Sequence, residues 1–472
     1  MAVEPLLRFA GRRGRSHDGG VAQPNLIRFT DAGLGNDSYL LVTAETALVV
    51  DPVRDVARYV DAAEAAGATV TAVAESHLHA DFVSGARELG ERGAEVFASA
   101  EAGLGFPTTP VRDGDEVRAG ELTLRVLATP GHTPEHVAYL ADADPPALFS
   151  GGALLPGGAA RTDLLGDDRT EELARALYRT LHQGLAALPD DTVVYPTHGA
   201  GSICSTGGPG GDRSTTLGWE RAANPLLQAR SEDEFVTRLV AGYGLYPPYF
   251  LHLRAVNTAG VLGPGPVPPP RLSLPQVSKE LAGGAWAIDV RATEAFGQRH
   301  LERSVSLPLT DSFPVWLGWT VPWGSRLVVV AAGERQAAEA VRRAAGIGYD
   351  DVAGWTPFDE AASVLPSAET EMLSADALGQ RLDDPAPPTL IDVRRPDEVT
   401  GGTLPGAVPI EAGRFGTAVP RGLTGPVVTY CRSGHRSMIV ASLLERAGVG
   451  PVAVYMDGAD GWRRSGRPLE QR

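Results

Sequence analysis

The chain is poor in cysteine and in long apolar runs, and each shortage excludes a class of protein. Its 472 residues include two cysteines, Cys204 and Cys431. A secreted protein of this size that relied on disulfide bridges would carry more, so we expect a reducing compartment, the cytoplasm. No run approaches the roughly 18 apolar residues that cross a bilayer, so we expect no membrane attachment.

Positive charge is also in deficit. The chain carries 42 lysines and arginines against 58 aspartates and glutamates, which gives a formal net charge of -16. This balance argues against nucleic acid as a partner and favours small solutes. The apolar share of 43% and the charged share of 21% are those of an ordinary globular protein, and the length suggests about three domains. The composition allows a homo-oligomer.

A segment rich in proline and glycine divides the chain. Its composition, at residues 263–270, favours an extended and semi-rigid linker. Near the start, a twin arginine lacks a following apolar stretch, so we expect a disordered arm and no export signal. The predicted parts are an arm over 1–24, a first domain over 25–260, the linker over 261–270, and two further domains over 271–366 and 367–472.

The apolar patterns predict an α/β protein throughout. In the first domain we expect strands over 38–43, 47–51 and 69–74, and helices over 55–66, 170–187 and 231–241. The last two domains resemble each other. Each has an apolar strand that ends in Asp-x-Arg, at 289–291 and at 392–394, and later a second apolar strand that enters a loop and a helix. Apolar strands that alternate with helices predict parallel sheets, and the repeat predicts a duplicated domain.

Cys431 lies between the predicted end of a strand and the start of a helix. Backbone N–H groups and the positive end of a helix dipole stabilise a thiolate there, which can lower a cysteine pKa from about 8.5 to the range ~3.5–7.5. Arg432 and Arg436 add charge and planar donors that suit anionic sulfur species. The alternative is an inert buried thiol, the usual state of a free cysteine, but two arginines in a Ser/Gly loop argue against it.

This loop resembles the rhodanese family, whose pattern is Cys-Arg-x-Gly-x-Arg-Ser/Thr. Its other members are Ser433, Gly434, His435 and Ser437. Related phosphatases have a loop that is one residue longer and fits phosphate. The resemblance implies an active rhodanese domain in which Cys431 carries sulfane sulfur as a persulfide and exchanges it with thiosulfate, persulfides and sulfite. The preceding domain has Ala331 and no cysteine in its loop, so we expect an inactive rhodanese-like domain used for packing or docking.

Four histidines follow predicted strands of the first domain, namely His77, His79, His132 and His198. Histidines in strand-end loops, two of them as His-x-His, are typical of a metal site. The pattern resembles the metallo-β-lactamase superfamily, which implies an αββα sandwich.

Longer motifs narrow this resemblance to persulfide dioxygenases, in particular the bacterial form fused to an inactive and then an active rhodanese domain. The motifs are His-x-His-Ala-Asp-Phe-Val-Ser-Gly, Thr-Pro-Gly-His-Thr-Pro-Glu, Arg-Thr-Asp-Leu and Pro-Thr-His-Gly-Ala-Gly-Ser-x-Cys. The resemblance implies one Fe(II) that uses O2 to oxidise a low-molecular-weight thiol persulfide, such as that of glutathione or coenzyme A, to sulfite. It also implies that Arg161, His198 and Cys204 lie near the substrate.

Two positions depart from the superfamily. Phe82 stands where dinuclear hydrolases place a histidine of the second metal site, which argues against a metallohydrolase. By resemblance the iron is held by two histidines, here His77 and His132, and by an aspartate that Gly152 replaces. The carboxylate ligand of the family is therefore missing.

This loss leaves several alternatives open. His79 completes a three-histidine site, which suits Fe(II) or Zn(II), or Asp81 substitutes for the lost carboxylate. Alternatively the domain is metal-free, and serves as a degenerate binding scaffold beside a working sulfurtransferase. A further alternative is a non-catalytic sulfur carrier that docks to a partner enzyme through the cysteine-free domain.

Overall fold

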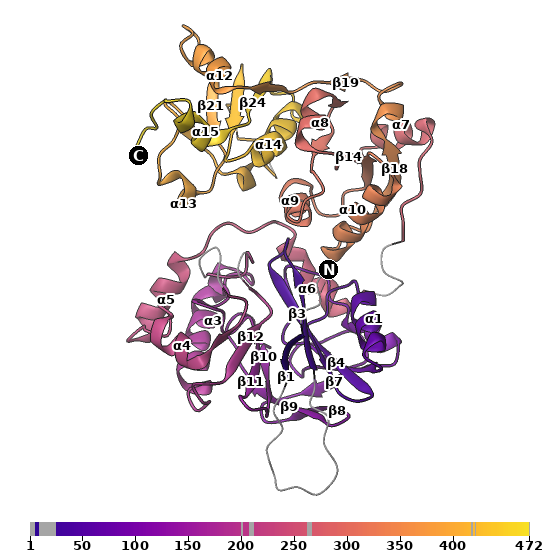
Figure 1. The fold of residues 1–472 in the computed structure, drawn as a ribbon, viewed down its shortest axis with the longest axis vertical. Coiled ribbons are helices and arrows are strands. Elements are labelled where there is room, and N and C mark those ends of the chain that lie inside the picture. The colour runs from indigo at the N-terminus through magenta and orange to yellow at the C-terminus, as the bar shows by residue number, and fades with distance from the viewer. Residues whose placement is uncertain are drawn as a thin grey trace, which may run out of the picture. The chain divides into compact units, whose positions relative to one another are not determined.

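The computed structural model of this chain describes residues 5–8, 25–199, 202–206, 212–261, 267–416, 419–420 and 422–471. The chain divides into two compact units (Figure 1). Unit 1 comprises Met1–Gly265 and Gly346–Gly348, and unit 2 comprises Pro266–Ala345 and Tyr349–Arg472.

Unit 1 contains two β-sheets. The first sheet has its seven strands in chain order, antiparallel from β1 to β4 and parallel from β4 to β7. These strands are β1 (Pro5–Arg8), β2 (Asn25–Asp31), β3 (Asn36–Val42), β4 (Thr46–Val50), β5 (Thr69–Ala74), β6 (Glu95–Ser99) and β7 (Thr109–Val111). Every residue of β3 is buried, as expected for a central strand whose two faces are both covered.

The second sheet has six strands in the order β13-β12-β11-β10-β9-β8. They are β8 (Glu116–Ala119), β9 (Leu122–Ala128), β10 (Val137–Ala141), β11 (Ala147–Gly151), β12 (Val193–Pro196) and β13 (Thr215–Thr216). All pairs are antiparallel except β11 with β12. In β8 and β9, buried and exposed residues alternate, so one face of this edge packs on the core and the other meets water.

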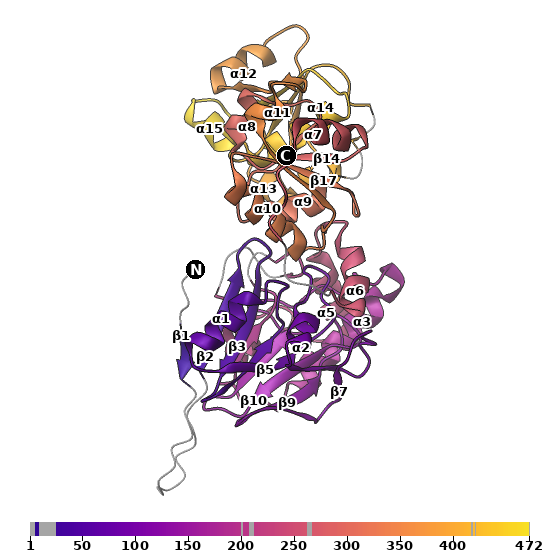
Figure 2. The ribbon, with the colours of Figure 1, turned by 90° about the vertical axis from the view of Figure 1, so that its right-hand side faces the viewer.

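Helices cover the outer faces of both sheets, so unit 1 has four layers. They are α1 (Ala57–Ala65), α2 (Ala86–Glu91), α3 (Asp167–Arg179), the π-helix η1 (Thr180–Gly184), α4 (Leu217–Ala223), α5 (Glu232–Ala241) and α6 (Phe250–Ala259). The helices α3, α4 and α5 lie beside the second sheet (Figure 1), and α1 and α2 lie over the first (Figure 2). Buried residues of both sheets, such as Leu41, Leu124 and Tyr139, form the core between them. The predicted αββα sandwich is confirmed.

Most predicted elements of unit 1 form where the pattern placed them. The strand over 69–74 has the predicted limits, and the helix predicted over 170–187 becomes α3 followed by a π-helical turn. The prediction of a disordered arm over 1–24 is wrong for Pro5–Arg8, because this segment pairs with β2. The rest of the arm and residues 262–266 of the predicted linker lie outside the described residues.

Unit 2 begins with a cysteine-free module that has a four-stranded parallel sheet in the order β16-β14-β17-β18. Its elements are α7 (Leu274–Ala282), β14 (Trp286–Asp289), α8 (Thr293–Gln298), β15 (His300–Leu301), β16 (Val305–Ser306), α9 (Phe313–Thr320), β17 (Leu327–Ala331), α10 (Glu334–Gly346), β18 (Val352–Pro357), α11 (Phe358–Ala361) and β19 (Ser367–Ala368). The strands β14 and β17 are the two apolar strands that the sequence predicts, and they pair directly.

The second module of unit 2, which carries Cys431, repeats this plan. Its parallel sheet has the order β20-β24-β23-β21-β22. Its elements are β20 (Glu371–Leu373), α12 (Ala375–Leu382), β21 (Thr389–Asp392), α13 (Pro396–Val399), β22 (Val408–Pro409), the 3-10 helix η2 (Ala412–Phe415), β23 (Val427–Tyr430), α14 (His435–Arg446), β24 (Val452–Tyr455) and α15 (Gly458–Arg464). The repeated plan confirms the parallel α/β prediction for both modules.

The two modules pack against each other within unit 2, with α8 beside α14 (Figure 1). The guanidinium carbon of Arg446 lies 3.8 Å from the ring centroid of Trp286. The Nε2 atom of His300 lies 3.3 Å from a carboxylate oxygen of Glu445. These contacts join α14 of the second module to the first.

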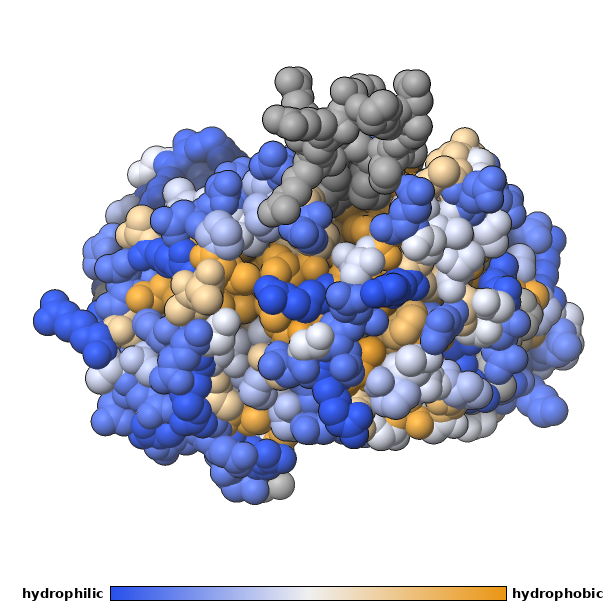
Figure 3. Space-filling model, turned by 90° about the horizontal axis from the view of Figure 1, so that it is seen from below, coloured by the Kyte–Doolittle hydropathy of each residue, from blue (hydrophilic) through white to orange (hydrophobic). Residues whose placement is uncertain are grey.

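The surface is mixed in polarity. In Figure 3, hydrophilic residues surround the rim of the face, and hydrophobic residues gather across its middle. Over the part of the chain that the structure describes, no helix is both long and apolar enough to cross a membrane.

Candidate functional sites

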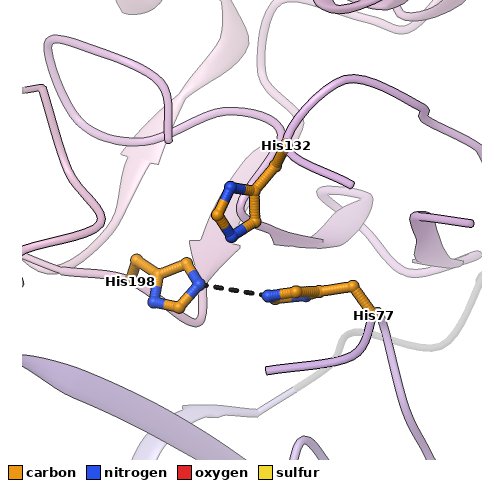
Figure 4. A group of neighbouring side chains, drawn as sticks. All are labelled: His77, His132 and His198. Atoms are coloured by element: carbon orange, nitrogen blue, oxygen red, sulfur yellow. Dashed lines mark hydrogen bonds between the residues drawn. The ribbon is translucent and has the colours of Figure 1, made fainter. Parts of the chain in front are cut away.

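Three histidines from three strand ends meet in unit 1. His77 follows β5, His132 follows β9 and His198 follows β12, and all three are buried. Each offers one ring nitrogen, and these nitrogens lie within 4.8 Å of one another. Figure 4 shows the three imidazoles pointing toward a common point.

The outer ring nitrogens of His77 and His132 are held by acceptors. The Nδ1 atom of His77 lies 2.8 Å from Ser76 Oγ, and Ser76 Oγ donates to Asp51 Oδ2 at 2.7 Å. The Nδ1 atom of His132 lies 2.6 Å from the carbonyl oxygen of Arg161. Because each acceptor takes the Nδ1 proton, the Nε2 atom of each ring keeps its lone pair.

His198 is held in the same way. Its Nδ1 atom lies 3.2 Å from Asn36 Oδ1 and 3.2 Å from Asp81 Oδ2, and its Nε2 atom lies 3.2 Å from His77 Nε2. Two buried lone pairs that face each other are unfavourable unless a proton or a cation lies between them. A set of imidazole lone pairs whose outer nitrogens are fixed by acceptors fits a transition-metal ion such as Fe(II) or Zn(II).

The electrostatic setting keeps two of these rings neutral. Burial lowers the pKa of His77 well below its ordinary value and lowers the pKa of His132 to about 3, and the neighbouring histidines add to both shifts. Neutral imidazole is the form that binds a metal.

His79 makes different contacts. Its Nε2 atom lies 3.4 Å from Asp51 Oδ1 and 3.4 Å from Glu75 Oε2, and its ring stacks on Phe82 with centroids 4.1 Å apart. Burial alone would lower its pKa, but the charges and hydrogen bonds of the two carboxylates raise it to about 10. The structure therefore places the predicted third ligand in an ion-pair cluster, although a trio of Asp51, His77 and His79 is also close enough to share an ion.

Asp81 contacts the outer ring nitrogen of His198, the one that points away from the other two histidines. It accepts a hydrogen bond from Asn36 Nδ2 at 2.8 Å and lies against the Nδ1 atom of His198. Burial would raise its pKa, but the charge and hydrogen bond of His198 lower it to about 2. Cys204 lies beside Asp81, and burial raises the pKa of its thiol well above the ordinary value. Cys204 is therefore a protonated thiol in this structure.

Gly152 lies directly against His132. A Cβ atom built at Gly152 would lie 2.6 Å from His132 Cδ2 and 3.1 Å from Ala160 Cβ, and the Gly152 N–H donates to His136 Nε2 at 2.9 Å. The space that a side chain at this position would need is filled by the His132 ring. The loss of the aspartate thus coincides with a close approach of His132.

The predicted substrate contact Arg161 is fully paired. Its guanidinium donates to both carboxylate oxygens of Asp163 at 2.6 and 2.7 Å and to the carbonyl of Gly244 at 2.9 Å. The guanidinium carbon also lies 4.6 Å from the ring centroid of Tyr246. Only 3% of Arg161 is exposed. Its visible role is to fix the backbone carbonyl that holds His132.

A small, partly open hollow borders His77. Its lining is mainly apolar and includes Leu78 and Phe106. Glu135 contributes a buried carboxylate that pairs with both terminal nitrogens of Arg254 at 3.0 and 3.1 Å.

The second site is the loop from Cys431 to Ser437. Cys431 directly follows β23 and is 1% exposed, and its Sγ atom lies 3.5 Å from Ser437 Oγ. Gly434, with a φ of 80°, directly precedes the first residue of α14. Only glycine adopts this left-handed conformation at little cost. The thiol therefore faces the N-terminal turn of a helix of twelve residues, as the sequence predicts.

The charged members of this loop differ in their surroundings. Arg432 and Ser433 are exposed. Arg436 is partly buried, and its two terminal nitrogens donate to the carboxylate of Glu398 at 2.5 and 2.7 Å. Burial would lower the pKa of Arg436, but its hydrogen bond with Glu398 and its contact with Cys431 raise it.

In each module the aspartate and the arginine of the Asp-x-Arg motif form an ion pair, the Asp-x-Arg bracket, at the end of a central strand. Arg394 forms a two-pronged ion pair with Asp392 at 2.6 and 2.9 Å. In the cysteine-free module, Arg291 pairs with Asp289 in the same way at 2.7 and 3.0 Å. The two modules therefore share this ion pair.

Sequence reasoning missed several of these positions. The histidine pattern included His198 in a metal site, but the family resemblance placed it near the substrate, and the structure brings it to the two predicted ligands. Asn36 and Asp51 went unnoticed, since each contacts a residue far along the chain, His198 and Ser76 respectively. Ser76 went unnoticed although it directly precedes His77, the ring that it holds. Glu398 lies four residues after the Asp-x-Arg motif of the last domain, but nothing in the sequence paired it with the loop.

Comparisons with known proteins agree with this architecture. The metallo-beta-lactamase superfamily matches residues 32–198, and the rhodanese-like domain matches residues 374–465. A metallo-beta-lactamase structure from Staphylococcus aureus has a TM-score of 0.63 and 27% identity, and covers 71% of this chain and 99% of that chain. The structure of ETHE1 from Myxococcus xanthus has a TM-score of 0.43 and 32% identity, and covers 50% of this chain and 98% of that one.

Two curated relatives are similar to part of this chain. The mitochondrial persulfide dioxygenase ETHE1 of Homo sapiens is 32% identical over 237 residues, which cover 49% of this chain and 87% of that protein. A hydroxyacylglutathione hydrolase of Polaromonas sp. is 37% identical over 169 residues, which cover 34% of this chain and 62% of that protein. The chain thus spans less than two thirds of the length of this second relative.

Proposed function

Because the chain belongs to the persulfide dioxygenase family and carries a rhodanese domain behind its metallo-β-lactamase domain, we propose that it is an enzyme of sulfane-sulfur metabolism. Its first activity is sulfur transfer at Cys431. The observation that supports this most strongly is the loop itself, in which a thiol at the head of α14 lies beside the guanidinium of Arg436.

The transfer proceeds in two balanced steps. The Cys431 thiolate attacks the outer sulfur of thiosulfate; a new S–S bond forms, the S–S bond of thiosulfate breaks, and sulfite leaves with the bonding electron pair. An acceptor nucleophile, such as cyanide or a thiolate, then attacks the outer sulfur of the Cys431 persulfide, and the Cys431 thiolate is released. The loop N–H groups and Arg436 stabilise the anions. The oxidation states balance without an added oxidant or reductant.

This activity is tested by thiocyanate formation from thiosulfate and cyanide. The Cys431→Ser variant should form none, whereas the matched Cys204→Ser variant should keep the wild-type rate, because Cys204 belongs to the other unit. Transfer that survives in Cys431→Ser contradicts the proposal.

A second activity, oxidation of a low-molecular-weight persulfide such as that of glutathione, is favoured by the convergence of His77, His132 and His198. These three residues would hold one metal ion, and iron there would supply the binding and activation of O2. Ser76 and the Arg161 carbonyl hold the rings in place.

The second activity is tested by metal analysis of the purified protein together with O2 uptake on glutathione persulfide. The expected result is about one iron per chain, with O2 consumed and sulfite formed. A protein without iron or O2 uptake contradicts this activity and supports the alternative that unit 1 is a degenerate binding scaffold. The thiocyanate assay is independent of that outcome.

A further inference from the structure

The carboxylate of Glu398 holds the arginine of the sulfur loop. Both of its oxygens accept hydrogen bonds from Arg436, at 2.5 and 2.7 Å. Glu398 is itself fixed, because its Oε2 atom accepts the backbone N–H of Arg395 at 3.1 Å at the start of α13. A rigid carboxylate therefore fixes the direction of a long and otherwise mobile side chain.

The cysteine-free module provides an internal control for the importance of this pair. Strand pairing matches Asp392 with Tyr430 and Asp289 with Val330. The next residue along the chain, Cys431 in one module and Ala331 in the other, therefore occupies the same place. Both modules keep the Asp-x-Arg bracket. The bracket therefore belongs to the fold, whether or not a thiol is present.

The glutamate goes with the thiol. Six places beyond Asp392 is Glu398, whereas six places beyond Asp289 is Ala295. The second residue of the following helix is an arginine in both modules, Arg436 in α14 and Arg335 in α10. The copy that lacks the thiol thus keeps an arginine at this place but lacks the glutamate that would hold it.

In the copy without a thiol, Gln336 closes the loop with hydrogen bonds to backbone groups. Its side chain accepts the Ala332 N–H at 2.8 Å and donates to the Val290 carbonyl at 2.9 Å. A loop of this design therefore closes without an ion pair. The Glu398–Arg436 pair accordingly goes with the thiol and is not needed for the fold of the loop.

We propose that Glu398 is a positioning residue for sulfur transfer, which acts by aiming the Arg436 guanidinium at Cys431. This inference rests on the proposed transfer at Cys431. With both terminal nitrogens bound to Glu398, the arginine cannot swing out to solvent, and it stays in contact with the thiol. A group held in place before the reaction stabilises the anions of both steps better than a mobile one.

The state of Glu398 agrees with this role. Burial would raise its pKa, but the hydrogen bonds and charge of Arg436 lower it to about 2. The pair is therefore charged throughout the pH range in which rhodanese-type transfer would be assayed.

The test is a double-mutant cycle of Glu398→Ala and Arg436→Ala, with thiocyanate formation as the readout. For Glu398→Ala we expect kcat to fall about 10–100-fold with little change in KM for thiosulfate, because misplacement of a stabilising group costs rates of this order. If Glu398 acts through Arg436, the double variant loses no more than Arg436→Ala alone. Glu398→Gln, which keeps one hydrogen-bond acceptor, should recover part of the loss.

A matched control is Glu371→Ala, which removes an exposed carboxylate that pairs with Arg381 at 2.5 and 2.6 Å in the same module. It should leave kcat unchanged. The proposal is overturned if Glu398→Ala keeps the wild-type kcat, or if the losses of the two single variants multiply in the double variant.

Failure of the proposed function is distinguishable from failure of this inference. If the wild-type protein forms no thiocyanate, the rate at which iodoacetamide alkylates Cys431, measured on the peptide by mass spectrometry, replaces kcat in the same cycle. Equal changes in Glu398→Ala, Arg436→Ala and the double variant support the positioning role. Independent changes, or none in Glu398→Ala, refute it.

Discussion

The histidine cluster and the sulfur loop are built in opposite ways. In the cluster, every ring is buried and each outer nitrogen is fixed by a neighbour, such as Ser76 or the Arg161 carbonyl. In the loop, the thiol is buried, but Arg432 and Ser433 beside it are exposed. The cluster therefore suits a resident ion, whereas the loop suits a group that must be reached and released at each turnover. The two designs should respond differently to substitution.

The largest expected effect is on metal binding. His198→Ala removes one of the three convergent imidazoles, so metal affinity should fall by more than the ~10–100-fold that loss of an outer hydrogen bond costs. Metal content after dialysis against a chelator measures this. The matched control is His182→Ala, a histidine stacked on Tyr178. Metal retained by His198→Ala but lost in a folded His79→Gln variant would show that His79, and not His198, is the third ligand.

The next effect concerns the residue behind His132. Arg161→Met breaks the pairing with Asp163 and loosens the carbonyl that holds the ring, so we expect metal affinity to fall ~10–100-fold. Arg175→Met, which breaks an exposed pair with Glu171 on α3, is the control. A variant with full metal affinity and a raised KM for persulfide would instead make Arg161 a substrate contact.

A smaller effect is expected at Gly152, where a Cβ atom would overlap the His132 ring. We predict that Gly152→Ala lowers the free energy of unfolding by about 1–3 kcal/mol, the usual cost of overpacking. Denaturant titration of the metal-free protein measures it. Gly184→Ala has open space around its Cβ position and should not destabilise the fold. Equal free energies of unfolding for the two variants would show that the His132 ring moves aside without cost, and would contradict the prediction.

The smallest effect is a pH dependence in the sulfur loop. The Arg436 pair lowers the pKa of Glu398 from 4.5 to about 2, so this carboxylate stabilises unit 2 above about pH 4.5, and the contribution is lost as the pH falls toward 2. Glu398→Gln should therefore flatten the decline in stability over this range. Thermal unfolding between pH 2 and 7 measures it. A variant whose decline matches the wild type would contradict the pairing.

The sequence predicts local features well, because they depend on local patterns. Apolar strands that end in a polar loop lead directly to His77, His132 and Cys431, and the structure confirms those strands. Contacts that join distant segments were out of reach. Arg436 and Glu398 are 38 residues apart, and His198 and His77 are 121 apart. No spacing rule links such pairs, since the fold alone sets their distance.

The burial of Cys204 has a consequence for the fate of stored sulfur. Its thiol is kept protonated, and its exposure is nil, so it is a poor nucleophile. The chain has no other cysteine besides Cys431. In the proposed transfer, a sulfur atom on Cys431 would therefore have no reactive thiol within its own chain to pass to, and could not be locked away in an internal disulfide. Such a protein would relay sulfur from one dissolved compound to another and would be poorly suited to keep it.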